Sequence, residues 1–310
     1  MKIAITGASG FIGKLLVDKL LSEGNEVNVL TRNRNKFIDS KVSVFEGDLN
    51  NIEVLRKFVL GVDVIYHCAA EIKNEMLMKT VNEDGTANLI EVSKNTISHW
   101  IQLSSTGIYG VIRDGLIFEN QKYNPLNEYE RTKLNSDLLV MEATNKYGFT
   151  STIVRPSNVF GPQMTNQSLF QLVKAVEKKM FFFIGKKGAS ANYVPVENVI
   201  EVLYLALVNK NAANKIFIIS DWCTMEHFIT TMAKSLGVEV PKYRLSIGFM
   251  KFVATITSFI PKNPLTVARI EALSNRSKYE TTKVENELGY KPVVSIENTI
   301  ERLVDFYKNK

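Results

Sequence analysis

Cysteine and histidine are scarce in this chain of 310 residues, and their scarcity excludes several kinds of site. The sequence holds two cysteines, Cys68 and Cys223, and three histidines. Two cysteines cannot build a disulfide framework, and so few Cys and His residues provide no cluster of metal ligands. His67 and His99 stand at the ends of strand patterns, so we interpret them as structural. We expect no metal site and a location in the reducing cytoplasm.

Long uninterrupted apolar runs are also missing. The most apolar stretch, residues 245–260 (LSIGFMKFVATITSFI), is interrupted by Lys251 and is shorter than the roughly 20 residues that a membrane span needs. We interpret it as an amphipathic helix that is buried or lies in an interface, and contact with a membrane surface is the disfavoured alternative. The N-terminus enters a strand pattern at once, without the basic and apolar regions of a signal peptide.

The excess of positive charge is small and dispersed. The formal net charge is +6, and the densest basic stretches, residues 32–36 and 186–187, are short. A nucleic-acid-binding surface would be more concentrated. We therefore expect no nucleic-acid partner, and we favour the phosphates of small ligands as the groups that this charge binds.

Strand and helix patterns alternate along the first half of the chain. Strand patterns lie at residues 2–6, 26–31, 42–46, 62–68, 100–104 and 150–155, and helical patterns between them lie at 14–23, 52–59, 83–95 and 129–146. This alternation predicts an α/β protein with a doubly wound parallel sheet, the Rossmann architecture, over residues 1–162. Residues 163–310 are mainly helical. We expect them to form a smaller substrate-binding region, with some segments returning to the sheet.

A glycine-rich turn, TGASGFIG at residues 6–13, joins the first strand pattern to the first helical pattern. Gly7 permits a tight turn, Gly10 lets the backbone approach a pyrophosphate, and Gly13 permits close packing of the helix. The free amides at the start of that helix can bind the anion. The turn therefore predicts a dinucleotide-binding site.

The end of the second strand pattern indicates which dinucleotide binds. Thr31 stands where NAD-binding units usually carry an acid, and Arg32 and Arg34 follow it. Arginine can bind the 2′-phosphate of NADP through charge-assisted hydrogen bonds, so NADP is favoured over NAD. Asp48 and Leu49 close the next strand pattern and are candidates to hold the adenine edge.

Tyr129 and Lys133 lie four residues apart in the motif NEYERTK. Residues at this spacing share one face of a helix, so both side chains can reach one cleft. A nearby ammonium favours the phenolate form of a tyrosine, whose pKa is ordinarily about 10. We therefore expect Lys133 to lower the pKa of Tyr129, and we expect this tyrosine to exchange a proton with a carbonyl or an alcohol.

Together these motifs resemble the extended short-chain dehydrogenase/reductases, the family of sugar-nucleotide epimerases, dehydratases and reductases. The resemblance covers residues 1–198 and includes five further motifs, namely GDL at 47–49, HCAA at 67–70, VNEDGTANLIE at 81–91, SSTGIYG at 104–110 and RPSNVFGP at 155–162. It implies NADP or NAD as the cofactor, and a homodimer that pairs through helices including residues 83–95 and 129–146.

The resemblance also implies the roles of individual residues. Ser105, Tyr129 and Lys133 form the implied catalytic triad, with Ser104 and Thr106 as rival hydroxyls. Tyr129 would exchange a proton with the substrate oxygen that Ser105 binds, while Lys133 lowers the tyrosine pKa and holds the nicotinamide ribose. Besides Tyr129 and Lys133, the implied cofactor contacts are Gly7, Ser9, Gly10, Phe11, Ile12, Gly13, Arg32, Asp48, Leu49, Ala69, Ala70, Asn82, Pro156 and Ser157. Asn158 is the implied contact to a substrate phosphate.

The chain departs from the family pattern at two places. Ala191 occupies the position where many sugar-nucleotide members carry an arginine that binds the substrate diphosphate. Lys186, Lys187 and Arg269 could supply positive charge from nearby, and we expect them to bind substrate. The acids that dehydratases place after their catalytic hydroxyl are also missing, because a threonine and a glycine follow Ser105. Dehydration is therefore disfavoured.

These observations favour an NADPH-dependent reductase of a nucleotide-linked 4-keto sugar, since net reduction in cells draws on NADPH. Three alternatives stay open. The same residues could serve an NAD-dependent nucleotide-sugar 4-epimerase. The apolar stretches at residues 181–183 and 245–260 would suit a hydrophobic ketone of flavonol or steroid type. A non-catalytic dinucleotide sensor or scaffold is the third, and the intact triad argues against it.

Overall fold

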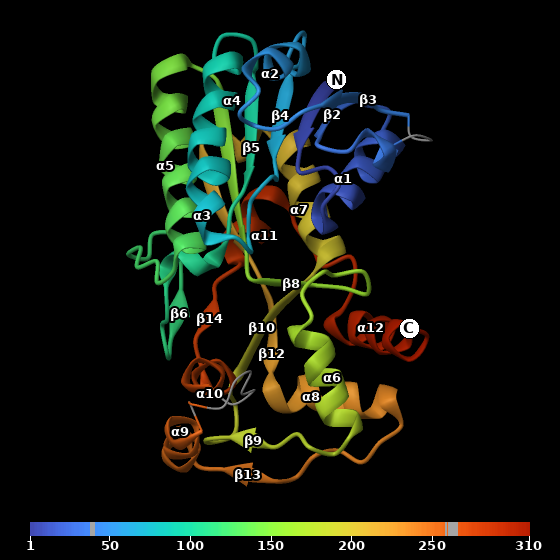
Figure 1. Ribbon diagram of the computed structural model, residues 1–310, viewed down its shortest axis with the longest axis vertical. Helices are drawn as coiled ribbons and strands as arrows, with labels where there is room; N and C mark the ends of the chain where they lie inside the picture. Colours follow the sequence, from blue (N-terminus) through green and yellow to red (C-terminus); the bar gives the residue numbers. More distant parts are fainter. Residues whose placement is uncertain (38–40, 258, 260–265) are drawn as a thin grey trace.

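The protein is described by a computed structural model that covers residues 1–37, 41–257, 259 and 266–310. It has two parts, which Figure 1 shows one above the other. The upper part is a large sheet between two layers of helices. The lower part is smaller and holds most of the C-terminal elements. None of the described helices has the length and apolar character needed to cross a bilayer.

The large sheet contains seven strands, and every neighbouring pair of them is parallel. Their order is β11-β7-β5-β4-β1-β2-β3, so the direction of winding reverses between β1 and β4. This confirms the predicted doubly wound architecture. The strands are β1 (Lys2–Thr6), β2 (Glu26–Thr31), β3 (Ser43–Glu46), β4 (Val64–His67), β5 (His99–Leu103), β7 (Thr150–Pro156) and β11 (Lys215–Ile219).

Helices cover both faces of this sheet, because its central strands carry buried apolar side chains on both sides. On one face, Ile3 and Ile5 pack with Leu16 and Leu203 against α1 (Phe11–Ser22), α7 (Val196–Val208) and α11 (Thr282–Leu288). The other face carries α2 (Ile52–Phe58), α4 (Gly85–Ser93) and α5 (Glu128–Tyr147), around Trp100 and its neighbours. The second half of the chain thus contributes a strand and two helices to the upper part.

The lower part is built around a three-stranded sheet of order β12-β10-β8, with β8 (Asn158–Phe160), β10 (Ser190–Pro195) and β12 (Asp221–Thr224). Its core includes Phe160, Phe228 and Ile300 and lies between this sheet and three helices, α6 (Ser168–Glu177), α8 (Met225–Leu236) and α12 (Ile296–Lys308). A separate apolar cluster joins α9 (Ile247–Ile256) and α10 (Val267–Ser274) to the short strands β9 (Phe183–Ile184) and β13 (Arg244–Leu245).

Several short elements were not predicted from the sequence. The turn of helix α3 (Glu75–Met78) continues through the π-helix Lys79–Asp84 into α4, where a single helix at residues 83–95 was expected. The two-residue strands β6 (Leu116–Ile117) and β14 (Lys278–Tyr279) pair across a long sequence separation. Such elements are too short to produce a periodic hydrophobic pattern, so tertiary contacts specify them.

The apolar stretch at residues 245–260 forms α9 at one end of the lower part (Figure 1). Met250 and Ala254 on its inner side are buried, as expected for a packed helix. Its outer side is exposed and also apolar, which an amphipathic pattern does not predict. Ser258 and Ile260, which belong to the same stretch, lie outside the described residues.

Candidate active site

The glycine turn after β1 has the geometry of a phosphate cradle. Gly7 has a φ of +71°, and a Cβ on it would lie 2.6 Å from the backbone nitrogen of Ala69. A Cβ on Gly13 would lie 2.2 Å from the carbonyl oxygen of Gly7. Both positions therefore require glycine. Gly10 caps α1 without any side-chain hydrogen bond, so no side chain competes with an anion for the first amides of the helix.

Two adjoining cavities follow this edge of the sheet and share Gly7, Gly10, Cys68 and Ala70 in their walls. The smaller has a volume of about 270 Å³, and its walls include the predicted contacts Ser9, Arg32, Asp48, Leu49 and Ala69. The larger has a volume of about 440 Å³, and its walls include the predicted contacts Phe11, Ile12, Gly13, Pro156 and Ser157. An elongated ligand that spans the glycine turn fits this arrangement, as a dinucleotide would.

Arg32 lies at the smaller cavity, and an acid that sequence reasoning missed lies there too. The carboxyl group of Glu71 accepts hydrogen bonds from the backbone amides of Ile72, Lys73 and Asn74. The amides of Lys73 and Asn74 lower the pKa of Glu71, and the charge of Arg32 lowers it further. A 2′-phosphate would therefore meet a guanidinium that already interacts with a carboxylate. The loop after β4 gives no sequence signal for this acid.

The side chain of Asn82, which we expected to contact the cofactor, is hydrogen-bonded to protein groups instead. It is buried in the π-helix, and its amide oxygen accepts a hydrogen bond from the Glu71 amide at 2.7 Å. Its amide nitrogen donates to the Glu71 carbonyl at 3.1 Å and to the Thr132 hydroxyl at 2.9 Å. Asn82 lines neither of the two cavities. Its side chain fixes the loop that carries Ala69 and Ala70, because its polar groups are already bonded to protein.

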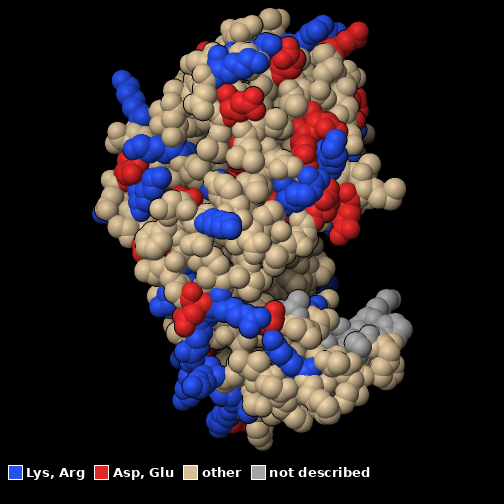
Figure 2. All heavy atoms as spheres, turned by 90° about the vertical axis from the view of Figure 1, so that its left-hand side faces the viewer, with Lys and Arg blue, Asp and Glu red and all other residues tan. Residues whose placement is uncertain are grey.

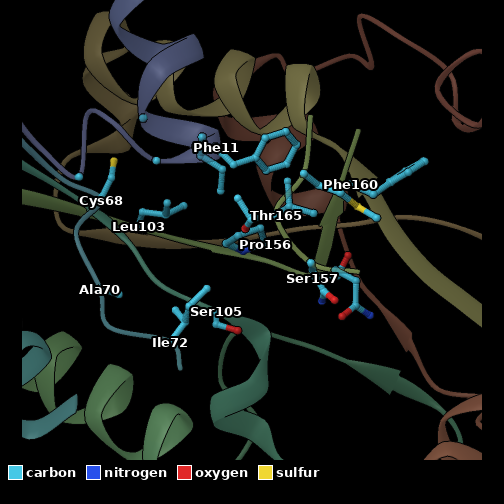
Figure 3. A pocket seen from close by; sticks show the side chains of 18 of the residues that line it. Phe11, Cys68, Ala70, Ile72, Leu103, Ser105, Pro156, Ser157, Phe160 and Thr165 are labelled. Atoms are coloured by element: carbon cyan, nitrogen blue, oxygen red, sulfur yellow. The ribbon is translucent and has the colours of Figure 1, made fainter. Parts of the chain in front are cut away.

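Ser105, Tyr129 and Lys133 all line the larger cavity. Ser105 follows β5 and begins a short 3-10 helix, Thr106–Tyr109. Tyr129 lies in the first turn of α5, whose N-cap is Asn127. The side chain of Asn127 accepts a hydrogen bond from the Glu130 amide at 2.9 Å. Lys133 follows one turn later. In Figure 3, Ser105, Ala70 and Ile72 lie on the side of the cavity opposite Phe11, Thr165 and Phe160.

The geometry favours Ser105 over its two neighbours. The hydroxyl of Ser104 donates to Asp137 Oδ2 at 2.7 Å, so its proton points away from a ligand. Thr106 is buried beside Tyr279 and does not line the cavity. The Ser105 oxygen accepts a hydrogen bond from the Gly107 amide at 3.1 Å, which leaves its own proton available for a substrate oxygen.

The electrostatics of Tyr129 and Lys133 differ from expectation. Burial raises the pKa of Tyr129 to about 12, and the negative charges of Asp137 and Glu130 add to that rise. Burial lowers the pKa of Lys133, whose Nζ donates to the Leu103 carbonyl at 2.6 Å. The pKa of Tyr129 is therefore raised where we expected Lys133 to lower it, because burial disfavours the charged phenolate. At neutral pH, Tyr129 is therefore a neutral phenol and can donate a proton.

Asp137 and Arg155 form a buried ion pair that acts on Tyr129 and Lys133, and the sequence patterns did not predict it. Asp137 Oδ2 lies 3.1 Å from Arg155 Nη2, and neither side chain has exposed surface. Arg155 also donates to the Tyr109 hydroxyl at 2.8 Å. The charge of Asp137 raises the pKa of Lys133 and so favours its ammonium form. Asp137 continues the i, i+4 series from Tyr129 and Lys133, which is the signal that could have identified it.

The predicted substrate residues do not come together. Asn158 lines the larger cavity, and its amide nitrogen donates to the Asn192 carbonyl at 3.0 Å. Lys186, Lys187 and Arg269 do not line it, and Arg269 is hydrogen-bonded to Gln171 on α6. Ala191 is fully buried in the core of the lower part. The expected cluster of cations beside Tyr129 is therefore absent from the described walls.

The rest of the larger cavity is uncharged. Among its described lining residues, Lys133 is the only one with a charged side chain. Apolar side chains from several elements contribute to the remaining wall, namely Ile72, Phe160, Met164, Leu169 and Tyr193. Uncharged polar side chains lie beside them, namely Thr165, Asn166 and Ser168. Such a wall can bind an apolar ring or sugar hydroxyls, but it offers no counter-ion to a diphosphate. No group of three described His, Cys, Asp or Glu residues could hold a metal ion.

The reversal of winding between β1 and β4, with the glycine cradle at that point, is typical of the class of dinucleotide-binding α/β proteins. Within that class, the chain belongs to the NAD dependent epimerase/dehydratase family, whose profile matches residues 3–220. It is accordingly an NAD(P)-dependent oxidoreductase of the epimerase/dehydratase type.

Relatives with different substrates match over nearly the whole chain. It is 28% identical to sterol-4-alpha-carboxylate 3-dehydrogenase, decarboxylating, of Mus musculus, covering 99% of this chain and 91% of that protein. It is 23% identical to the N-acetyl-alpha-D-glucosaminyl-diphospho-ditrans,octacis-undecaprenol 4-epimerase of Escherichia coli O157:H7, over 98% and 94% of the two chains. The structure of UDP-glucuronic acid 4-epimerase from Bacillus cereus in complex with NAD has a TM-score of 0.78 at 23% identity, over 100% and 99%.

Proposed function

We propose that the protein is a reductase that converts a keto group on a sugar to an alcohol, with NADPH as the hydride source. The observation that carries this proposal is the neutral phenol of Tyr129 in the wall of the larger cavity. A reduction needs a proton donor at the carbonyl oxygen, and a phenol with a pKa of about 12 is protonated at neutral pH. The absence of acids after Ser105 agrees with reduction and not with dehydration.

Each residue of the proposed triad has one task. The bound cofactor would supply a hydride to the carbonyl carbon. Ser105 donates a hydrogen bond to the carbonyl oxygen and holds it beside Tyr129. Tyr129 donates its proton to that oxygen, so the C=O bond becomes CH–OH. Lys133 offsets the charge that develops on the phenolate. Its Nζ donates to the Leu103 carbonyl, and the charge of Asp137 favours its ammonium form.

NADPH is proposed over NADH because Arg32 lies at the cavity beyond the glycine turn. No acid follows β2 directly, so the second strand offers no carboxylate to the ribose hydroxyls of NAD. Glu71 weakens this preference, because its carboxylate competes with a 2′-phosphate for Arg32. The charge of Arg32 lowers the pKa of Glu71. We therefore propose a moderate preference for NADPH and not an exclusive one.

Two candidate substrates differ in the molecule that carries the keto group. A nucleotide-linked 4-keto sugar fits the neighbouring structures, one of which is a UDP-glucuronic acid 4-epimerase complexed with UDP-glucuronic acid and NAD. A hydrophobic ketone is the second candidate, because Lys133 is the only charged side chain among the described residues of the cavity wall. The relation to sterol dehydrogenases supports the second candidate as well.

One assay separates these candidates. Purified protein is supplied with NADPH or NADH, and with either a UDP- or dTDP-linked 4-keto sugar or a steroid 3-ketone, while the absorbance of the reduced cofactor is followed. The proposal expects oxidation of NADPH by the keto sugar. Oxidation by the steroid ketone alone would establish the second candidate. Interconversion of nucleotide sugars without net consumption of cofactor would instead establish a 4-epimerase.

We also propose that the protein is a homodimer that pairs through α4 and α5. Leu138 on the outer face of α5 is 45% exposed, which suits a helix that packs against a second copy. Light scattering measures the oligomeric state directly. The wild type is expected at twice the mass of one 35.0 kDa chain, and Leu138→Glu is expected to shift it towards the single mass. A wild type of single mass would contradict this proposal.

A further inference from the structure

Helix α9 is apolar on both of its faces, although only one of them is packed. Its inner face contributes Met250 and Ala254 to the cluster with α10, β9 and β13. Four large apolar side chains point outward, and their exposed fractions are 55% for Phe249, 64% for Phe252, 52% for Ile256 and 79% for Phe259. Phe249, Phe252 and Ile256 lie at i, i+3 and i+7 of the helix, which places them along one outer stripe, and Phe259 follows shortly after the helix ends at Ile256. An aromatic stripe of this size on a surface indicates an interaction site.

Positive charge surrounds this stripe. The two segments that carry β9, β13 and α9, residues 178–187 and 242–257, contain seven Lys or Arg residues and no Asp or Glu. Ile247 of α9 lies beside Gly185, so the start of the helix is next to Lys186 and Lys187. In Figure 2, Lys and Arg side chains gather over the lower part of the molecule, beside an uncharged surface. The apolar stripe therefore has a cationic border.

Some of these cations are neutralised by neighbouring elements and others are not. Three carboxylates reach the border from outside these segments, and they pair Arg244 with Glu226, Lys242 with Glu239 and Lys251 with Glu271. Lys186 and Lys187, next to the start of α9, form no ion pair with a described residue, whereas Lys179 lies close enough to Glu239 to lower the pKa of that carboxyl. The border thus keeps a net positive charge after its internal pairs are counted.

We propose that α9 binds the surface of an anionic lipid bilayer, with its aromatic stripe among the acyl chains and the lysines at the lipid headgroups. Phenylalanine and isoleucine side chains gain free energy when they leave water, and lysines near an anionic surface attract its headgroups. A second copy of the chain fits the same face less well. In a two-fold symmetric contact the patch meets itself, so the unpaired lysines of one copy would lie against those of the other.

This surface is independent of the hydride chemistry, because none of the four outward side chains lines either cavity. It revises the sequence expectation that the segment at residues 245–260 is buried or in a protein interface. The helix lies in the plane of the membrane in this proposal, and its ten residues do not cross the bilayer.

The test is sedimentation of the full chain with two kinds of vesicle, one of phosphatidylglycerol and phosphatidylcholine and one of phosphatidylcholine alone. We expect binding to the anionic vesicles only, weakened by raised salt. Phe249→Ser together with Phe252→Ser should lower the partition coefficient at least tenfold. Lys186→Ala together with Lys187→Ala should lower it about twenty-five-fold on anionic vesicles, at roughly fivefold per lysine.

A matched control keeps the outcome interpretable. Leu60→Ser together with Val208→Ser also removes two exposed apolar side chains, but from the upper part, and should leave vesicle binding unchanged. All variants are first compared with the wild type by thermal melting. The proposal is overturned if the wild type ignores anionic vesicles, or if the double phenylalanine variant still binds them as the wild type does. It is also overturned if that variant changes only the mass measured by light scattering, because the stripe would then be a contact between copies.

Discussion

The cofactor side and the substrate side of the active-site edge are built in different ways. On the cofactor side, Gly7, Gly10 and Gly13 lie within one turn of seven residues, and the shape of the backbone itself forms the site. On the substrate side, the wall is assembled from side chains far apart in sequence, such as Ile72, Leu169 and Tyr193. A backbone site tolerates few residues at its turns, whereas a side-chain wall can change its chemistry one residue at a time. The second arrangement explains how a shared fold can accompany relatives with sugar and sterol substrates.

The largest effect is expected at Tyr129, which lies where the cofactor side meets the substrate side. Tyr129→Phe removes the proton donor and should lower turnover about a hundredfold to ten-thousandfold. Binding of NADPH, followed by fluorescence, should stay nearly unchanged, because the glycine turn is untouched. Tyr243→Phe is the control, since that tyrosine is 80% exposed and lies outside both cavities. Full activity in the Tyr129 variant would remove it from the proposed mechanism.

The next effect tests whether the cofactor side is a backbone site. A Cβ at position 13 would lie 2.2 Å from the Gly7 carbonyl oxygen, so Gly13→Ala should displace the turn. Overpacking of this kind costs about 1–3 kcal/mol, and we expect cofactor affinity to fall at least fivefold. Gly24→Ala is the matched control. Its φ of +76° brings backbone strain, but no atom lies within 4 Å of the added Cβ, so stability should fall without a change in cofactor titration.

Arg32 provides a smaller effect at the far end of the same side. Arg32→Ala should lower the affinity for NADPH about tenfold and leave that for NADH unchanged, because only the former carries a 2′-phosphate. Parallel titrations of the wild type and the variant measure the ratio. An equal loss for both cofactors would mean that Arg32 binds a group that the two share. Glu71→Gln should act in the opposite direction and strengthen NADPH binding, since it removes the competing carboxylate.

His67 tests the packing beneath the cofactor side through its pH dependence. Burial lowers the pKa of this histidine to about 3, and its ring nitrogens are hydrogen-bonded to Thr6 and Thr86. The folded chain therefore keeps His67 neutral, while the unfolded chain binds a proton below about pH 6.5. Its contribution to stability is complete above that pH and is lost as the pH falls towards 3.

Between pH 7.5 and 6.0 this loss should be about 0.8 kcal/mol in the free energy of unfolding. Urea unfolding at the two pH values measures it, and His67→Gln should reduce the difference by that amount. An equal pH dependence in wild type and variant would show that the ring is protonated in the folded chain as well.

The smallest effect is expected on the substrate side. Lys186→Ala with Lys187→Ala should change the KM for a nucleotide-linked keto sugar less than twofold, because neither lysine lines the larger cavity. Leu169→Ala, which enlarges that cavity, provides the contrast and should raise KM. A large increase in KM for the lysine variant would mean that Lys186 and Lys187 do contact the substrate.

Sequence reasoning succeeded where local pattern and chemistry coincide. The alternation of strands and helices gave the sheet, and the Tyr129 helix was expected to end within a residue of its observed end at Tyr147. Ser105 and Lys133, whose roles the family resemblance implied, line one cavity. Burial cannot be read from spacing, so the direction of the Tyr129 pKa was wrong. The same limit concealed the burial of Asp137, whose partner Arg155 lies on β7, the strand that follows α5 along the chain.

The substrate side was harder to predict because its residues meet only through tertiary packing. Lys186 and Lys187 stand near Ala191 in sequence, but β9 and β10 belong to different small sheets. Proximity along the chain therefore gave no information about proximity to Tyr129. Asn82 illustrates the same limit, since the motif alone gave no sign that its side chain is hydrogen-bonded to Glu71 and Thr132.

The strand β11 has a consequence for how the chain folds. It closes one edge of the seven-stranded sheet beside β7, yet it comes from residues 215–219, about sixty positions after its partner. During synthesis, one edge of β7 therefore stays without its partner strand until residues 215–219 have been made. Pairings between distant segments form slowly, and an open edge strand invites association with other chains. A polypeptide that stops at residue 162 would keep the glycine cradle and Tyr129 but would tend to aggregate through β7.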